Sequence, residues 1–321
     1  MINNIQNENY YIINNNQNIF NINTNNIIYN NSNNNNIQNN NIYNNINAQS
    51  WIKIDRNKPS LGLGNIGSTC YMNATLQSLA HIPELAEDLI NIYYSNKKNN
   101  NIKKNKLTTE FMKLMINIYF PKRNKDFFAP YDIKNIIGVK EVLFRGNEAE
   151  DAKDLYLFLI ETMNYELNGE KNQIYNDIVK LGIDLRDQYK IKQTFLNEFW
   201  NKNNNSPIAK YLYGFSVTIS KCLKCGTKKY NYECFNFINF PLLDIKNFLK
   251  NKNNNYNEDY VLNLEDCFLF NQKKEIYNGI NKMMCNYCNG FEDGQIQRII
   301  DISPPVLVLV LDRGIDNLLF K

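Results

Sequence analysis

Apolar residues recur every three to four positions along the first half of the chain, which is the period of an α-helix. The spacing predicts helices from Thr69 or Cys70 to about His81, from Pro83 to about Tyr94, from Leu107 to Phe120 and from near Glu148 to about Leu167. The last of these should bury Leu155, Phe158, Leu159, Thr162 and Met163. The Asn- and Lys-rich stretch 96–106 is expected to form a loop.

The second half of the chain has a different pattern, rich in aromatic and β-branched residues that alternate with polar ones. This pattern predicts strands at Phe215–Lys221, Tyr230–Phe240, Gly294–Ile302 and Val306–Leu311, the last buried on both faces. A second Asn-rich insertion, 251–255, is expected to be a hairpin loop. Helices followed by strands predict an α+β architecture with a helical lobe, a sheet lobe and a cleft between them.

Residues 1–57 are set apart by composition, because 24 of the first 50 residues are Asn. Such a tract has few groups able to form a packed core, so we expect a disordered tail. The remaining residues, 58–321, are enough for a large buried core.

The charge and cysteine content narrow the functional classes. The chain has 36 basic and 32 acidic residues, a balance that does not favour nucleic-acid binding. We see no secretory signal and no apolar run long enough to cross a bilayer, so we expect no membrane partner. Seven cysteines, an odd number that includes two C-x-x-C pairs, favour a reducing compartment. We therefore expect a cytoplasmic or nuclear monomer.

Cys70 is a candidate nucleophile, because it follows a Gly-rich loop and lies at the start of a predicted helix. The partial positive charge at a helix N-terminus favours thiolate, the attacking form of cysteine. Asn65 could present its side-chain amide, and Cys70 its N–H, to the oxygen of a tetrahedral intermediate. On spacing alone, a structural cysteine behind an ordinary turn remains an alternative.

The segment from Gly62 to Gln77 follows the pattern G-L-x-N-x-G-x-T-C-Y-M-N-x-x-L-Q. It resembles the cysteine box of the ubiquitin-specific proteases, papain-like thiol enzymes that cut the bond after the C-terminal glycine of ubiquitin. The resemblance implies that Cys70 is the nucleophile and Asn65 the oxyanion donor. It also implies a fold with a helical thumb, a β-rich palm and zinc-bearing fingers.

A second box of the same family is similar to Glu150-Asp-Ala-Lys-Asp154-Leu. The resemblance implies that Asp151 and Asp154 contact arginines near the C-terminus of ubiquitin. The first glutamines of the family's box are replaced by Ala149 and Glu150, so their contacts are not expected here. The alternative is an acidic first turn that complements the helix dipole.

Two cysteine pairs form a candidate metal site: Cys222 with Cys225, and Cys285 with Cys288. Two such pairs can complete a tetrahedron of thiolates around one structural zinc. In the family such pairs lie at the end of the fingers. Cys234 and Cys267 have no paired partner and are expected in the core.

The resemblance continues through Pro304–Arg313 and so covers residues from about 60 to 321. It implies a thumb at about 60–170, fingers at about 211–302 and the start of the palm at about 303–321. Ubiquitin and ubiquitinated proteins are the implied partners.

A cysteine nucleophile of this kind needs a histidine base, and the sequence offers no suitable one. The only histidine is His81, eleven residues after Cys70 and at the far end of its helix. In the family the base follows the strand at Pro304–Arg313, so we expect a protease domain incomplete at its C-terminus. The alternatives are a ubiquitin-binding pseudoenzyme and an unrelated zinc-stabilised interaction module.

Overall fold

The computed structural model describes residues 53–54, 61–99, 101, 106–121, 126–169, 184–203, 206–252 and 260–313. The predicted tail at 1–57, apart from 53–54, and the end of the chain beyond residue 313 lie outside these ranges. The chain divides into two compact units. We call them the helical unit, from the described parts of 38–176 and 196–211, and the sheet unit, from the described parts of 177–195 and 212–321.

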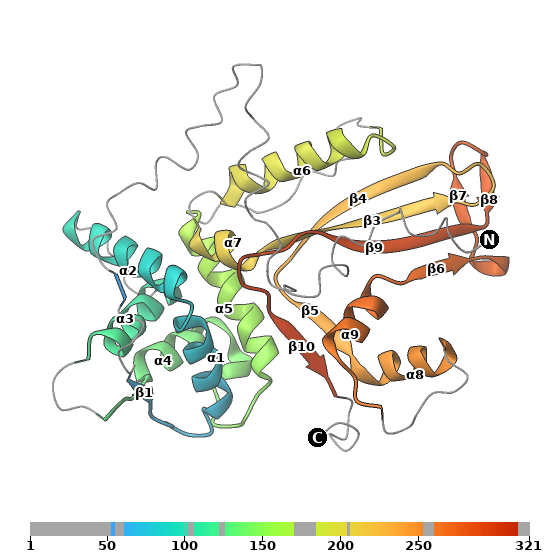
Figure 1. The fold of residues 1–321 in the computed structure, drawn as a ribbon. Coiled ribbons are helices and arrows are strands. Elements are labelled where there is room, and N and C mark those ends of the chain that lie inside the picture. Colours follow the sequence, from blue (N-terminus) through green and yellow to red (C-terminus); the bar gives the residue numbers. More distant parts are fainter. Residues whose placement is uncertain are drawn as a thin grey trace. The chain divides into compact units, whose positions relative to one another are not determined.

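The helices of the helical unit pack against one another (Figure 1) and bury apolar side chains. Its elements are β1 (Gly62–Leu63), α1 (Cys70–Ala80), α2 (Pro83–Lys98), α3 (Leu107–Tyr119), β2 (Phe127–Phe128), α4 (Tyr131–Lys140), the 3-10 turn η3 (Val142–Phe144) and α5 (Ala152–Leu167). Helix α6 (Gln188–Asn203) belongs to this unit from residue 196 onward, the short α7 (Pro207–Leu212) follows, and β1 pairs with β2 in parallel. None of the helices in the described ranges is long and apolar enough to cross a lipid bilayer.

Most of the predicted helices of this unit are confirmed, with shifted ends. Helix α2 continues to Lys98, beyond the expected end near Tyr94, so the predicted loop at 96–106 begins later. Helix α5 begins at Ala152 and not near Glu148, because the Asp151 carboxylate accepts a hydrogen bond from Lys153 N–H at 2.7 Å and caps the helix there. Within α5, Tyr156 and Ile160 are buried, whereas Phe158 and Thr162, expected in the core, are only half-buried.

A buried carboxylate joins three helices of the helical unit. Glu166 of α5 accepts hydrogen bonds from Thr108 N–H at 2.8 Å and from the Thr108 hydroxyl at 2.7 Å at the start of α3. It also accepts from Leu107 N–H and pairs with Lys140 of α4 at 3.0 Å. The Glu166 side chain is only 4% exposed. Glu166 therefore supplies the N-terminal cap that no residue of α3 provides.

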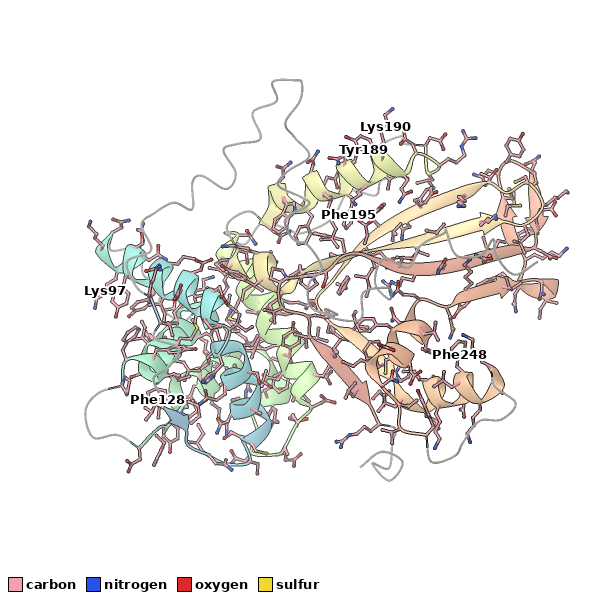
Figure 2. All side chains as sticks on the ribbon, in the orientation of Figure 1. Lys97, Phe128, Tyr189, Lys190, Phe195 and Phe248 are labelled. Atoms are coloured by element: carbon pink, nitrogen blue, oxygen red, sulfur yellow. The ribbon has the colours of Figure 1, made fainter. Side chains whose placement is uncertain are left out.

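The sheet unit is built on a four-stranded antiparallel sheet of order β4-β3-β9-β6 (Figure 1). The strands are β3 (Gly214–Cys222), β4 (Lys228–Phe235), β6 (Lys274–Tyr277) and β9 (Gly294–Ile302). The hairpin of β7 (Met283–Cys285) and β8 (Gly290–Glu292) lies at one end of this sheet, next to the turn between β3 and β4 (Figure 1). The start of α6 also packs here: Figure 2 shows Phe195 pointing toward the sheet, where its ring lies 5.8 Å from that of Phe215, while Tyr189 and Lys190 point away.

A second core in the sheet unit lies around β5 (Ile238–Pro241), which pairs in parallel with β10 (Leu309–Asp312). Helices α8 (Leu242–Lys252) and α9 (Leu264–Asn271) pack against it. Asn263 and Asp266 form a capping box at the start of α9. The buried members of this core are Ile238, Phe240, Leu242, Ile245 and Cys267.

Strand predictions are confirmed for β3 and β9, whereas the expected strand Tyr230–Phe240 is divided between β4 and β5. One expectation is wrong, and another lies partly outside the described residues. Helix α8 continues to Lys252, because Leu242, Ile245 and Leu249 pack on the core at helical spacing, so a loop does not begin at 251. The rest of the expected hairpin loop, 253–255, lies outside the described ranges. The strand at Val306–Leu311 is not buried on both faces: Leu309 packs on the core around β5, but Leu311 is 52% exposed.

Candidate functional site

Cys70 is the first residue of α1, and its side chain is exposed. The residue before it, Thr69, is the N-cap of the helix but makes no side-chain cap hydrogen bond. No acidic residue lies in the first turn. The unsatisfied N–H groups at the start of α1 therefore have no negative partner on their own helix, and their partial positive charge remains available to an anion at Cys70.

The Asn65 side chain is held in one orientation by three donors. Its Oδ1 accepts hydrogen bonds from Gly67 N–H at 3.2 Å, from Thr69 N–H at 3.1 Å and from the Thr69 hydroxyl at 3.1 Å. Because backbone N–H groups only donate, the atom that faces them must be the carbonyl oxygen. The Nδ2 amide of the exposed Asn65 is thus turned away from the loop as a donor.

The backbone of this loop is also tightly constrained. Gly67 has φ +110° and Ser68 has φ +45°, so two consecutive residues lie in the left-handed region. Gly64 donates its N–H to Phe128 O at 2.9 Å, and a Cβ at this position would lie 2.8 Å from the Phe127 ring. Only glycine fits at residue 64 without displacing that ring.

Thr69 and Asn73 both hold the loop, a role that the sequence did not reveal. The Thr69 hydroxyl also accepts from Ile66 N–H at 3.1 Å, and Asn73 Nδ2 donates to Gly64 O at 3.0 Å. The available signal was that both are polar residues within the Gly62–Gln77 pattern.

His81 lies at the opposite end of α1 from Cys70, as expected from the sequence. It is the C-cap of the helix, and its Nδ1 lies 2.7 Å from Gln77 O. Eleven residues of helix separate the two ends by about 16 Å at roughly 1.5 Å per residue. His81 therefore does not approach the Cys70 thiol.

Asp151 and Asp154 lie at the start of α5, and both side chains are exposed. Asp151 caps the helix through the hydrogen bond to Lys153 N–H. Asp154 lies 3.3 Å from the ammonium of Lys153, and the two side chains are 48% and 39% exposed. Exposed pairs of this kind contribute little to stability, so Asp154 is available to a partner.

The four predicted metal ligands of the sheet unit are brought together. The sulfur atoms of Cys222, Cys225, Cys285 and Cys288 all lie within 4.8 Å of one another. Cys222 and Cys288 are 3.9 Å apart at their sulfurs, and Cys225 and Cys285 are 3.6 Å apart. These separations are far longer than a disulfide of about 2.05 Å. They match the spacing of about 3.8 Å between corners of a tetrahedron with Zn–S bonds of about 2.3 Å.

The backbone gives the two cysteine pairs the same shape. Cys222 ends β3 and Cys285 ends β7, and each is followed by a tight turn that carries the second cysteine. The residue after each second cysteine has a positive φ, +74° at Gly226 and +54° at Asn289. Two strand ends and two matching turns therefore hold four thiols in a set that fits one zinc ion.

The fold agrees with that of a known protein family. A family model described as ubiquitin carboxyl-terminal hydrolase matches residues 61–317. The chain belongs to the ubiquitin carboxyl-terminal hydrolase family. Its described elements, helices in one unit and a sheet with a four-cysteine cluster in the other, are those of a ubiquitin-specific protease fold.

Individual members of the family align over part of this chain. The chain is 25% identical over 189 residues to ubiquitin carboxyl-terminal hydrolase Usp2 of Drosophila melanogaster, an alignment covering 59% of this chain and 19% of that protein. It is 26% identical over 211 residues to ubiquitin carboxyl-terminal hydrolase 12 of Saccharomyces cerevisiae, with 61% and 16% covered. The chain therefore spans about a fifth or less of the length of these relatives.

A solved structure supports the same fold. The structure of the SAGA Ubp8/Sgf11/Sus1/Sgf73 DUB module bound to ubiquitin aldehyde superposes with a TM-score of 0.52 at 21% identity. The match covers 80% of this chain and 48% of the solved chain. At 21% identity this similarity supports the fold alone, that is, the arrangement of helices and strands.

Proposed function

We propose that Cys70 is the nucleophile of a thiol-dependent deubiquitinase that cuts the bond after the C-terminal glycine of ubiquitin. The observation that carries this proposal is the fixed orientation of Asn65, whose Oδ1 is engaged by Gly67 and Thr69. Its Nδ2 can then donate to an oxyanion near Cys70, together with the Cys70 N–H at the start of α1.

In the first step, the Cys70 thiolate attacks the carbonyl carbon of the last glycine of ubiquitin. The carbonyl electrons move to the oxygen, and Asn65 and the Cys70 N–H stabilise the resulting charge. Collapse of this intermediate releases the amine and leaves ubiquitin bound to Cys70 as a thioester. Water then hydrolyses the thioester and regenerates the thiol.

This cycle needs a group that takes and returns protons, and the 321 residues contain a single histidine, His81. His81 is held at the far end of α1 against Gln77 O. We therefore expect no measurable turnover of ubiquitin substrates by this polypeptide alone. The full reaction would require a histidine that this sequence does not contain.

Ubiquitin binding would involve Asp151 and Asp154 at the start of α5. Both carboxylates are exposed, and their position matches the acidic residues of the family's second box. Arginine pairs well with carboxylates in bidentate geometry, which suits the basic C-terminal region of ubiquitin.

We also propose that one structural zinc ion is held by Cys222, Cys225, Cys285 and Cys288. Their sulfur separations fit tetrahedral thiolate ligation. All four ligand positions would be occupied by protein, so the ion would tie the β3–β4 turn to the β7–β8 hairpin and take no part in the chemistry.

A second candidate is a ubiquitin-binding protein that does not cut, and the placement of His81 favours it for this polypeptide. The two can be separated with ubiquitin that carries an electrophile at its C-terminus. If Cys70 is poised as a nucleophile, the chain should form a covalent adduct that appears in mass spectrometry and is lost in Cys70→Ala. Binding of ubiquitin without any adduct would favour the second candidate, and absence of both would contradict the first.

A further inference from the structure

Two amide side chains on α1 hold the loop that carries Asn65. Asn73 Nδ2 donates to Gly64 O at 3.0 Å, and one turn further Gln77 Nε2 donates to Leu61 O at 3.2 Å. The two residues are four apart and so lie on the same face of α1. This face is otherwise apolar, with Met72, Leu76 and Leu79 buried on its flanks.

Both amides are held in these orientations at a cost. The other end of each side chain, Asn73 Oδ1 or Gln77 Oε1, is buried and has no hydrogen-bond partner among the described residues. A buried carbonyl oxygen without a donor is unfavourable. Because the loop carbonyls only accept, each side chain must face them with its N–H group and leave its oxygen unpaired. The hydrogen bonds that Asn73 and Gln77 donate to the loop therefore come with an unpaired buried oxygen in each side chain.

Asn73 helps to hold Gly64, the residue directly before Asn65. Gly64 has its N–H fixed on Phe128 O, its carbonyl fixed by Asn73 and its α-carbon packed under the Phe127 ring. Asn65 Oδ1 is then fixed from the other side by Thr69. We propose that Asn73 is a positioning residue for the oxyanion donor: by holding the Gly64 carbonyl, it sets where Asn65 Nδ2 points.

This inference rests on the proposed function, since it assumes that Asn65 donates to an oxyanion. Ubiquitin aldehyde reports on that step without turnover. The Cys70 thiolate adds to the aldehyde carbon, a C–S bond forms, and the C=O π electrons become an oxyanion that then takes a proton from water. The ratio of the Kd for unmodified ubiquitin to the Kd for ubiquitin aldehyde therefore measures thiol addition and oxyanion stabilisation.

Asn73→Leu removes the amide and keeps the branching of the side chain at Cγ. Loss of a whole oxyanion donor lowers the rate of an enzyme by roughly 10²–10³-fold. A misplaced donor should therefore lower the ratio of the two Kd values by about 10-fold. Affinity for unmodified ubiquitin should stay within about twofold. Gln77→Met is the matched control, because it removes the same kind of bond from the same helix but at Leu61, three residues before Gly64. It should leave the ratio unchanged.

A double-mutant cycle tests whether Asn73 acts through Asn65. In an Asn65→Ala background, Asn73→Leu should cause no further loss of the ratio. If Asn73→Leu fails to fold, the isosteric Asn73→Asp removes the donor with little change in packing and should lower the ratio in the same way.

The outcomes separate the two proposals. If the unchanged chain binds ubiquitin and ubiquitin aldehyde equally, the proposed function fails, and this inference fails with it. If the unchanged chain favours the aldehyde but the Asn73 variants keep that preference, only the positioning role is wrong. An equal loss in Gln77→Met, or a further loss in the Asn65→Ala background, would also overturn the role of Asn73.

Discussion

Thr69 donates twice to one atom, Asn65 Oδ1, through its N–H and its hydroxyl, both at 3.1 Å. The same hydroxyl accepts from Ile66 N–H at 3.1 Å. Thr69 is 1% exposed, so its hydroxyl is buried, whereas Asn65, which accepts from it, is exposed. The threonine before Cys70 thus organises the loop and does not cap the helix with its side chain.

Replacing Thr69 with valine should loosen this loop. Thr69→Val keeps the shape of the side chain but removes the donor to Asn65 and leaves the Ile66 N–H without its acceptor. Such losses cost about 1–2 kcal/mol of unfolding free energy. Urea denaturation should show this loss, and adduct formation with electrophilic ubiquitin should slow. Thr69→Ser retains the hydroxyl and is the control; an equal defect in both variants would mean that the methyl group, not the hydroxyl, matters.

Glu166 should be a strong determinant of stability in the helical unit. Glu166→Gln places an NH₂ group among N–H donors from Leu107 and Thr108 and removes the charge that faces Lys140. Hydrogen bonds to charged groups contribute roughly 1.5–3 kcal/mol each, so we expect a loss of about 2 kcal/mol or more. Urea denaturation measures it. The exposed Glu161 on the same helix supplies the control, and Glu161→Gln should change stability by less than about 0.5 kcal/mol.

Asp151 offers a way to separate helix capping from ubiquitin binding. Asparagine caps helices about as well as aspartate, so Asp151→Asn should keep α5 stable and remove only the charge. If Asp151 contacts an arginine of ubiquitin, affinity should fall by about 10-fold in calorimetric titrations, because charged hydrogen bonds contribute roughly 1.5–3 kcal/mol. Asp132→Asn, at an exposed first-turn carboxylate of α4, is the control and should bind normally. Unchanged affinity in Asp151→Asn would assign Asp151 to capping alone.

Metal removal should affect the sheet unit and leave the Cys70 loop intact. We expect one zinc per chain by elemental analysis, and a chelator should release it and lower the thermal stability of the protein. Cys225→Ser should reduce the zinc content, whereas Cys234→Ser, whose thiol is outside the cluster, should not. Full zinc content in Cys225→Ser, or chelation with no release and no loss of stability, would contradict the metal site.

The sequence was most informative where local rules decide structure. The N-terminus of α1 and the ends of α3, β3 and β9 follow from apolar period, glycines and turn residues close in the chain. The two errors have different causes. The start of α5 is set by a local side-chain cap, from Asp151 to Lys153 N–H, which the apolar period does not reveal. The exposure of Leu311 depends on distant packing, because the core around β5 covers only one face of β10.

The residue types and spacings of the candidate sites could be read from the sequence: Cys70 follows a Gly-rich loop that carries Asn65, and 59 residues separate two C-x-x-C pairs. The distance of His81 from Cys70 along α1 could be read in the same way, since helix geometry is local. That four sulfurs meet within 4.8 Å depends on tertiary structure, because strand pairing between β3 and β9 aligns distant turns. Only it showed that Asn73 and Phe128 fix Gly64, since contacts of α1 and β2 with the loop depend on packing that spacing does not specify.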